Sequence, residues 1–210
     1  MKKIFSLLVL CATVVFASCS KDDPVTDPVP EGIVVTTYEA LLDALQTGGT
    51  SADAPTLITL GGNITVPAGG DYDTPPINGS GHFKIDGGGH TITGMYVDER
   101  ESGSAAGLFG RISSNEQQGT SIPSPAVKNL TVAGATVYAS SAGMQETSSG
   151  ILVGFCIANE GLAVQFENIA VSGTVVNEMG DTNCVSGGLA GYVTRGAFKN
   201  CRAENIAVSG

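Results

Sequence analysis

The chain has 210 residues, a formal net charge of −10 at pH 7 and a charged-residue content of only 14%. Its hydrophobic content of 42% is enough for the core of one domain and excludes disorder over most of the chain. The excess of acidic residues excludes an electrostatic attraction to nucleic acids or to anionic lipid headgroups.

Residues 1–18 read as a signal peptide. Lys2 and Lys3 precede the apolar segment Ile4–Phe16, which is too short to span a bilayer, and Cys19 follows two small residues. This arrangement resembles a bacterial lipoprotein leader, and the resemblance implies that Cys19 is lipidated. The alternative is an ordinary secretory leader that is cleaved elsewhere.

Residues 19–32 are predicted to be a disordered tether. They are acidic, contain Pro24, Pro28 and Pro30, and cannot bury a core. The stretch Ser20–Asp23 resembles the acidic export signal that follows the lipidated Cys in some Gram-negative surface lipoproteins. That resemblance implies a lipid anchor in the outer membrane, with the body facing the cell exterior. A plain spacer facing the periplasm is the alternative.

The body begins with one predicted helix. Apolar residues stand at positions 38, 41, 42 and 45, which is helical spacing. Thr36 and Glu39 match a capping box, and Gly48 and Gly49 follow the run. The apolar stripe of this helix must cover another part of the core.

Short β-like runs between glycines make up the rest of the body. They occupy residues 57–66, 83–97, 107–110, 127–137, 151–158, 166–176, 187–193 and 198–210. No helical pattern separates them, which excludes alternating βαβ units. The sequence therefore predicts one all-β domain over residues 33–210.

Two phrases recur along this domain. Copies of an Asn phrase, NLTVAG, NIAVSG and NIAVSG, begin at positions 129, 168 and 205, and these starts are 39 and 37 positions apart. The second phrase, GLFG, ILVG and GLAG, ends at positions 110, 154 and 191. A period near 40 is typical of a solenoid. Because the phrases alternate, we expect a turn of about 17–25 residues.

Each turn is expected to lay a strand in parallel against the next turn, about 4.8 Å away. Ile and Val alternate with Ala and Ser in the Asn phrase, so Leu130, Ile169 and Ile206 are predicted to share one buried column. The Asn that opens each phrase either stacks at a corner and bonds neighbouring backbone or is an ordinary turn residue. An uncapped end would leave open strand edges, which favours end-to-end self-association.

The phrases GLFG and GLAG, followed by FKNCRAENIAVSG, resemble the GLUG-motif repeats of bacterial surface proteins. The stretch IDGGGHTITGM at residues 85–95 is similar to the opening turns of pectin-lyase-like proteins, and residues 33–48 resemble their capping helix. The resemblance implies a right-handed parallel β-helix with a short N-terminal capping helix. Because the chain stops on a repeat phrase, we expect a stack that is truncated at its C-terminus or lacks its far cap.

Carboxylates are the first candidates for chemistry. The notable ones are Asp71, Asp73, Asp86, Asp98, Glu99 and Glu101. None recurs at the repeat period and no basic residue aligns with them, so a structural or solvated role is favoured over catalysis.

The loop at residues 70–83 is the candidate ligand-binding loop. It carries Asp71, Tyr72, Asp73 and His82. His82 and His90 lack a metal-binding spacing, and His90 is expected to lead into a strand, so we expect no metal and no other cofactor. Tyr72 and Tyr96 are the best aromatic candidates for a sugar contact, and no aromatic platform is evident.

Three cysteines, Cys156, Cys184 and Cys201, remain beyond the leader and Cys19. Cys184 and Cys201 are 17 positions apart, close to one predicted turn, so they are a candidate disulfide. Buried free thiols are the other interpretation. A catalytic thiol is disfavoured, because no His lies near in the sequence.

The sequence therefore favours a lipid-anchored, adhesin-like surface protein that binds glycans or proteins of host or neighbouring cells, and not an enzyme. The expected partners are the membrane, through the anchor, and these surface ligands, with no nucleic acid. A carbohydrate-active enzyme, a polysaccharide lyase or glycoside hydrolase, is the alternative on the same scaffold. A plain stalk is a third interpretation.

Overall fold

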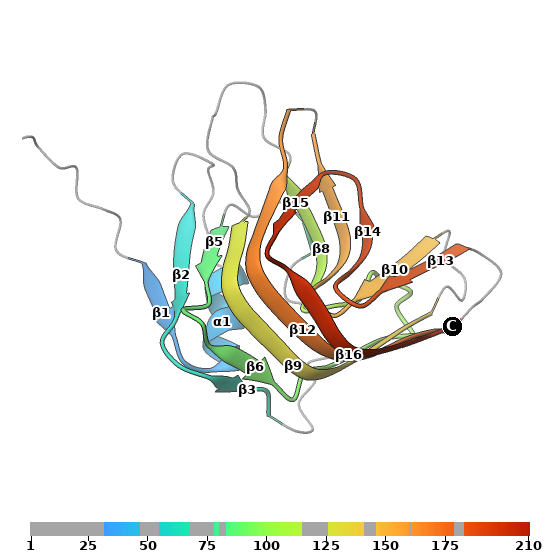
Figure 1. The fold of residues 1–210 in the computed structure, drawn as a ribbon, viewed down its shortest axis with the longest axis horizontal. Coiled ribbons are helices and arrows are strands. Elements are labelled where there is room, and N and C mark those ends of the chain that lie inside the picture. The colour runs from blue at the N-terminus through green and yellow to red at the C-terminus, as the bar shows by residue number, and fades with distance from the viewer. Residues whose placement is uncertain are drawn as a thin grey trace, which may run out of the picture.

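The computed structural model describes residues 32–46, 55–67, 78–79, 83–114, 126–140, 146–159, 161–178 and 183–210. Within these ranges the chain forms one α-helix and β-strands β1 to β16, and all the strand pairs are parallel (Figure 1). The prediction of an all-β domain with one short helix is confirmed. The predicted signal peptide, Cys19 and the tether up to residue 31 lie outside the described residues.

The strands form three sheets. The largest runs in the order β1 (Ile33–Val35), β2 (Thr56–Leu60), β5 (Phe83–Asp86), β9 (Ala126–Ser140), β12 (Val164–Glu178) and β15 (Gly196–Lys199). It also contains β3 (Ile64–Thr65), β6 (Thr91–Thr93), β7 (Tyr96–Glu99) and β16 (Arg202–Ser209). The second sheet runs β14 (Ala190–Val193), β11 (Val153–Ala158), β8 (Phe109–Ser114), β4 (Asn78–Gly79), and the third pairs β10 (Glu146–Gly150) with β13 (Asn183–Gly187).

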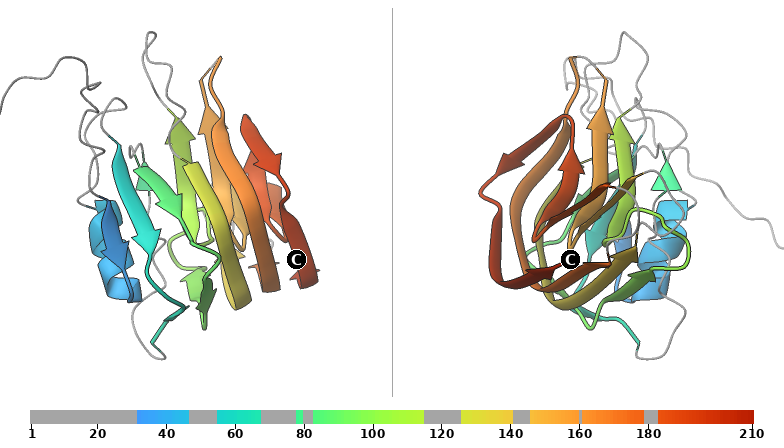
Figure 2. Two further views of the ribbon diagram at one scale, coloured as in Figure 1. Left: turned by 60° about the vertical axis from the view of Figure 1, so that its left-hand side comes forward. Right: turned by 90° about the vertical axis from the view of Figure 1, so that its right-hand side faces the viewer.

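The chain visits the sheets in turn and returns to the first sheet beside its earlier strand. We call each such pass a layer; β10, β11 and β12 form one layer, and β13, β14, β15 and β16 form the next (Figure 2). Ile169 pairs with Leu130, 39 positions earlier, whereas Ile58 pairs with Ile33, only 25 positions earlier. The predicted turn of 17–25 residues is therefore wrong for the later layers, because the two phrases lie on different sides of one layer.

Equivalent apolar side chains stack in columns between the sheets. Ile58, Ile85, Val127 and Phe166 are paired in register, and each is no more than 2% exposed. Burying one such side chain contributes about 1.5–3 kcal/mol, so a column over several layers supplies most of the stability.

The helix α1 (Tyr38–Gln46) covers the N-terminal end of this core. Tyr38, Leu41 and Ala44 face inward and are 1–3% exposed. The backbone N–H of Ala40 donates to Thr37 Oγ1 at 3.2 Å, so Thr37, and not the predicted Thr36, caps the helix. The predicted helix is confirmed with this shift of its cap. No helix among the described residues has the length and apolar character needed to cross a bilayer.

The second phrase stacks as the sequence predicts. Phe109 pairs with Val153, and Val153 pairs with Ala190, so GLFG, ILVG and GLAG lie side by side in successive layers. Ile151, which replaces the expected Gly in the middle copy, is fully buried.

The Asn phrase stacks differently from the prediction. Leu130 and Ile169 do form a buried column, but Ile206 pairs with Gly173 instead of Ile169. Lys199 pairs with Glu167 and Arg202 pairs with Ala170, which places Cys201 beside Ile169. The repeated Asn that matches Asn168 is therefore Asn200, and the second NIAVSG lies further along its layer.

Glycine is required where adjacent layers approach most closely. A Cβ at Gly173, where φ is +144°, would collide with the carbonyl oxygen of Ala135 in the neighbouring layer. We expect Gly173→Ala to lower the free energy of unfolding by about 1–3 kcal/mol or more, because backbone must shift to admit the methyl group. Urea denaturation measures this change.

Gly62→Ala is the matched control for Gly173→Ala. A Cβ at Gly62 meets no atom within 4 Å, and its φ lies outside the left-handed region. Its effect should stay within about 0.5 kcal/mol of zero. Equal destabilisation by the two variants would contradict the close contact at Gly173.

Candidate functional site

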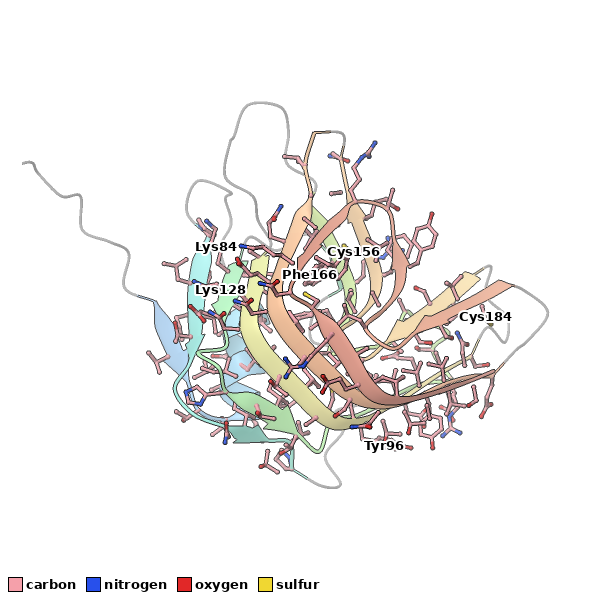
Figure 3. The ribbon with its side chains drawn as sticks, in the orientation of Figure 1. Lys84, Tyr96, Lys128, Cys156, Phe166 and Cys184 are labelled. Atoms are coloured by element: carbon pink, nitrogen blue, oxygen red, sulfur yellow. The ribbon has the colours of Figure 1, made fainter. Side chains whose placement is uncertain are left out.

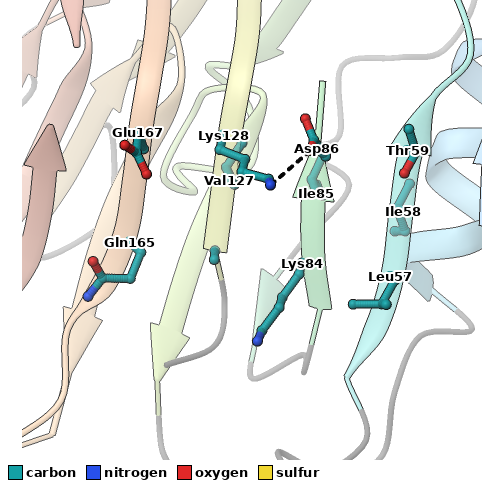
Figure 4. A pocket seen from close by; sticks show the side chains of 11 residues that line it. Leu57, Ile58, Thr59, Lys84, Ile85, Asp86, Val127, Lys128, Gln165 and Glu167 are labelled. Atoms are coloured by element: carbon teal, nitrogen blue, oxygen red, sulfur yellow. Dashed lines mark ion pairs between the residues drawn. The ribbon is translucent and has the colours of Figure 1, made fainter. Parts of the chain in front are cut away.

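A groove crosses the outward face of the largest sheet over β2, β5, β9 and β12 (Figure 4). It has a volume of about 420 Å³. Its outward side chains are Leu57, Thr59, Lys84, Asp86, Ala126, Lys128, Gln165 and Glu167. Strands expose alternate residues on this face, and parallel pairing sets residues of equivalent position side by side.

One row of the groove is a ladder of alternating charge. Asp86 pairs with Lys128, Lys128 with Glu167, and Glu167 with Lys199, one residue from each layer. Lys128 Nζ lies 2.9 Å from Asp86 Oδ2, and Lys199 Nζ lies 2.6 Å from Glu167 Oε1. We call this row the charge ladder. The prediction that no basic residue aligns with these carboxylates is therefore wrong.

Exposure limits what the charge ladder adds to stability. The side chains of Lys128 and Lys199 are 53% and 71% exposed, and exposed ion pairs contribute about 0–1 kcal/mol each. Burial of the apolar columns contributes more to stability than these exposed ion pairs do. The charge ladder therefore adds little to stability, and a one-residue slip would lose its ion pairs, because Lys128 would face Ile85 or Gly87.

A second row, the Asn ladder, lies beside the charge ladder. Asn129, Asn168 and Asn200 have φ near +54°, and each donates through Nδ2 to the ladder residue of the preceding layer. The acceptors are Asp86 at 3.0 Å, Asn129 at 2.9 Å and Asn168 at 3.1 Å. The expected stacking is therefore found for Asn129 and Asn168, but the acceptors are side-chain oxygens instead of the expected backbone, and Asn200 takes the third place in the ladder instead of Asn205.

Asp86 begins both ladders and has a structural role. Partial burial alone would raise its pKa, but hydrogen bonds from Asn129, the Gly88 N–H and Lys128 outweigh burial, so the pKa lies below its ordinary value of 3.8. A carboxyl group with a lowered pKa is ionised at neutral pH and is a poor general acid.

Lys84 and Gln165 form the polar part of the groove beside the ladders. Lys84 pairs with Ala126, and Ala126 with Gln165, so they lie in one row over three layers (Figures 3 and 4). Gln165 Nε2 donates to Ala163 O at 3.2 Å. Among the residues that the structure describes, Lys84 is the lysine without an ion pair, so its ammonium group is available to a ligand.

The outward face of the second sheet carries an aromatic row that the sequence analysis missed. Arg111 Cζ lies 4.3 Å from the ring centroid of Phe155, and the rings of Phe155 and Tyr192 stack at 5.1 Å. Arg111 pairs with Phe155 and Phe155 with Tyr192 in register. The alignment of the GLFG phrase contained this signal, because each of these residues follows its copy by the same offset.

Tyr96 lies on a different side of the molecule from Lys84 and Lys128 (Figure 3). Its ring contacts Tyr138 at a centroid distance of 5.7 Å, and the guanidinium of Arg100 lies 4.5 Å from the Tyr138 ring centroid. Arg100 forms ion pairs with Asp98 and Glu178. Hydrogen bonds from Arg100, offset in part by burial, lower the pKa of Asp98. This cluster is internally paired.

The predicted ligand-binding loop at residues 70–83 lies mostly outside the described residues. Asp71, Tyr72, Asp73 and His82 lie outside the described residues, and so does Cys19. His90 directly precedes β6, and its carbonyl accepts from the N–H of Thr131 at 3.1 Å, as a residue leading into a strand should.

Glu99 lies in the interior, only 4% exposed, and its carboxylate accepts from Ser102. Glu101 is exposed in the following turn. No group of three or more His, Cys, Asp or Glu side chains suited to a metal ion occurs within the described ranges.

The candidate disulfide between Cys184 and Cys201 does not form, which corrects that prediction. Cys184 lies in β13 opposite Thr147, whereas Cys201 lies between β15 and β16, which are on another side of the same layer from β13 (Figure 1). A spacing of 17 residues is less than one layer, so the two are never in adjacent strands. Burial raises the pKa of the Cys156 thiol to about 12, which excludes a reactive thiolate there.

Comparison of the chain with family models, curated proteins and solved structures finds no match.

The lowered pKa of Asp86 makes stability depend on pH. A carboxylate whose pKa is lower in the folded chain stabilises it above the unfolded pKa, and this contribution is lost as pH falls through the folded pKa. We expect Asp86→Asn to reduce the acid-induced loss of stability between about pH 5 and pH 2. Urea unfolding midpoints of the wild type and of Asp86→Asn, measured across that pH range, give the loss of stability of each.

Lys128→Met tests the cause of this pH dependence. It removes one of the groups that lower the pKa of Asp86 while keeping a long aliphatic side chain. Its acid profile should fall between those of the wild type and Asp86→Asn. An Asp86→Asn profile as steep as the wild type would contradict the role given to Asp86.

Proposed function

We propose that the chain is the body of a lipid-anchored surface protein, built as a right-handed parallel β-helix, that binds an extended glycan or surface polypeptide in the groove without cleaving it. The observation that carries this proposal is the pairing of both groove carboxylates. Asp86 is held by Lys128, Asn129 and the Gly88 N–H, and Glu167 is held by Lys199. Both carboxylates are therefore engaged by residues of the chain itself.

The solenoid part of the proposal is supported by the layers. Parallel strands with equivalent residues in register, closely spaced Gly positions and the Asn ladder are what a β-helix requires. The in-register GLFG, ILVG and GLAG phrases support the likeness to GLUG-motif repeats. The expected membrane anchor at Cys19 supplies the cellular location.

The form of the groove supports an extended ligand. It crosses four strands, which at about 4.8 Å per strand spacing is roughly 14 Å along the stack. Its floor is apolar at Leu57 and Ala126, and Lys84, Thr59 and Gln165 supply polar groups beside it. Apolar contact with a few placed donors is how chains of sugars or peptides are held without chemistry.

The proposal predicts binding without turnover. A glycan array probed with the full chain should identify a ligand, and incubation with that glycan should leave its chain length unchanged. Depolymerisation of any glycan that binds, abolished by Asp86→Asn, would overturn the non-catalytic assignment and favour the enzyme alternative.

Lys84→Ala tests the groove itself. Loss of one charge-assisted hydrogen bond, about 1.5–3 kcal/mol, should weaken binding of the array-identified glycan about tenfold or more. Arg202→Ala is the control, because it removes the same charge from the exposed strand β16, outside the groove. Calorimetric titration gives both affinities, and equal effects of the two substitutions would place the ligand elsewhere.

A further inference from the structure

The groove contains a cation without a counter-ion. Lys84, in β5, is half-buried, and within the described parts of the chain its ammonium group forms neither an ion pair nor a hydrogen bond. The other described lysines, Lys128 and Lys199, each pair with a carboxylate. A charged group that is partly removed from water is stabilised by an opposite charge. The unpaired ammonium group therefore indicates a ligand that carries a negative charge.

The register of the sheet explains why Lys84 has no partner in the described chain. Leu57 and Ala126 stand beside it in the adjacent layers, and neither carries a charge. Asp86 follows on the same face of β5, but its carboxylate pairs with Lys128 at 2.9 Å. Figure 4 shows the Lys84 side chain directed away from Asp86. The small side chain of Ala126 leaves room for a carboxylate to reach the ammonium group.

The groove suits one negative charge and not a series of them. Among the described residues that line it, Lys84 is the unpaired cation. Further carboxylates on a ligand would lose water without gaining a partner, beside Asp86 and Glu167 and in a chain with a net charge of −10. This disfavours a polymer with an acidic group on every unit.

The main chain of the groove strands is not available to a ligand. β2, β5, β9 and β12 each pair with another strand along both edges. An extended peptide must satisfy its own N–H and C=O groups, which it does by adding to a sheet edge. A sugar needs partners for its hydroxyl groups, and the side chains of Thr59 and Gln165 supply donors and acceptors for them. The groove therefore fits a glycan better than a peptide.

We propose that the ligand of the groove is a glycan that is neutral except for one carboxylate-bearing sugar of the sialic acid type. This inference rests on the proposed function and names the class of ligand. The carboxylate pairs with Lys84 over Ala126. Apolar groups of the ligand contact Leu57, and hydroxyl groups of the neutral sugars bond to Gln165.

Two probes that differ in one charge test this proposal. They are sialyllactose and its sialic acid carboxamide, which keeps every ring and hydroxyl group but has no carboxylate. In calorimetric titration of the full chain, sialyllactose should bind at least tenfold more tightly than the amide, because it adds a charge-assisted contact. This preference should shrink as salt rises from about 0.05 M to about 0.5 M, because salt screens the pair.

Substitutions at Lys84 assign the preference to its charge. Lys84→Met should weaken the binding of sialyllactose about tenfold and leave that of the amide unchanged, whereas Lys84→Arg should retain the preference. Arg202→Met is the matched control, because it removes the same charge from β16, outside the groove, and it should change neither affinity. Circular dichroism checks that each variant keeps the fold.

Ala126→Ile separates a failure of this inference from a failure of the proposed function. The larger side chain occupies the floor of the groove between Lys84 and Gln165, so it should weaken the binding of any ligand held there. The probes for this variant are sialyllactose, the carboxamide and any neutral glycan that the array identifies.

Equal binding of the acid and the amide, a preference that Lys84→Met leaves intact, or an absence of sialyllactose binding overturns the acidic-sugar assignment. If another glycan then binds and Ala126→Ile weakens it, the proposed function stands without this inference. Glycan binding that Ala126→Ile leaves unchanged would place the ligand outside the groove and would overturn both. Tighter binding of tetraglutamate than of sialyllactose would assign the groove to an acidic polypeptide, which also contradicts the inference.

Discussion

Successive layers of this protein stack in register, so that each side chain lies beside its equivalent in the layers before and after it. Burial of the inward columns, such as Ile58, Ile85, Val127 and Phe166, stabilises the stack. Register then follows from close backbone contacts and from the Asn ladder. A slip by one residue would turn every inward side chain outward, which is why weak surface pairs can still select the arrangement.

The same constraint builds the candidate site. Residues at one outward position of each layer become a row, so Asp86, Lys128, Glu167 and Lys199 meet although they are far apart in the chain. Because the charges alternate, each carboxylate of this row forms an ion pair with a lysine of a neighbouring layer. This pairing is the basis for proposing binding without catalysis. Lys84 differs from the other described lysines in having no ion pair, because the residue beside it in the next layer is Ala126 and not a carboxylate.

A helix, and not another strand layer, covers the first layer that the structure describes. At the N-terminal end, Tyr38, Leu41 and Ala44 of α1 close the core. In the layer formed by residues 183–210, Phe198 and Val208 are 38% and 48% exposed.

The sequence by itself determined the all-β class, the helix near residues 38–45, most strand positions and the stacking of the GLFG phrase. Alternation and helical spacing are local signals, and they survive in the fold. Only the tertiary structure decided the length of a layer, the match of Asn200 with Asn168, the charge and aromatic rows, and the separation of Cys184 from Cys201. Alternation fixes which face a residue occupies but not which residue of another layer lies beside it. The backbone bends at residues with positive φ, which include Gly134, Asn205 and the Asn residues of the ladder, and these bends set the register. Between Val132 and Ala135, β9 has one residue more than β12 has between Val171 and Gly173, so the pairing shifts by one residue there.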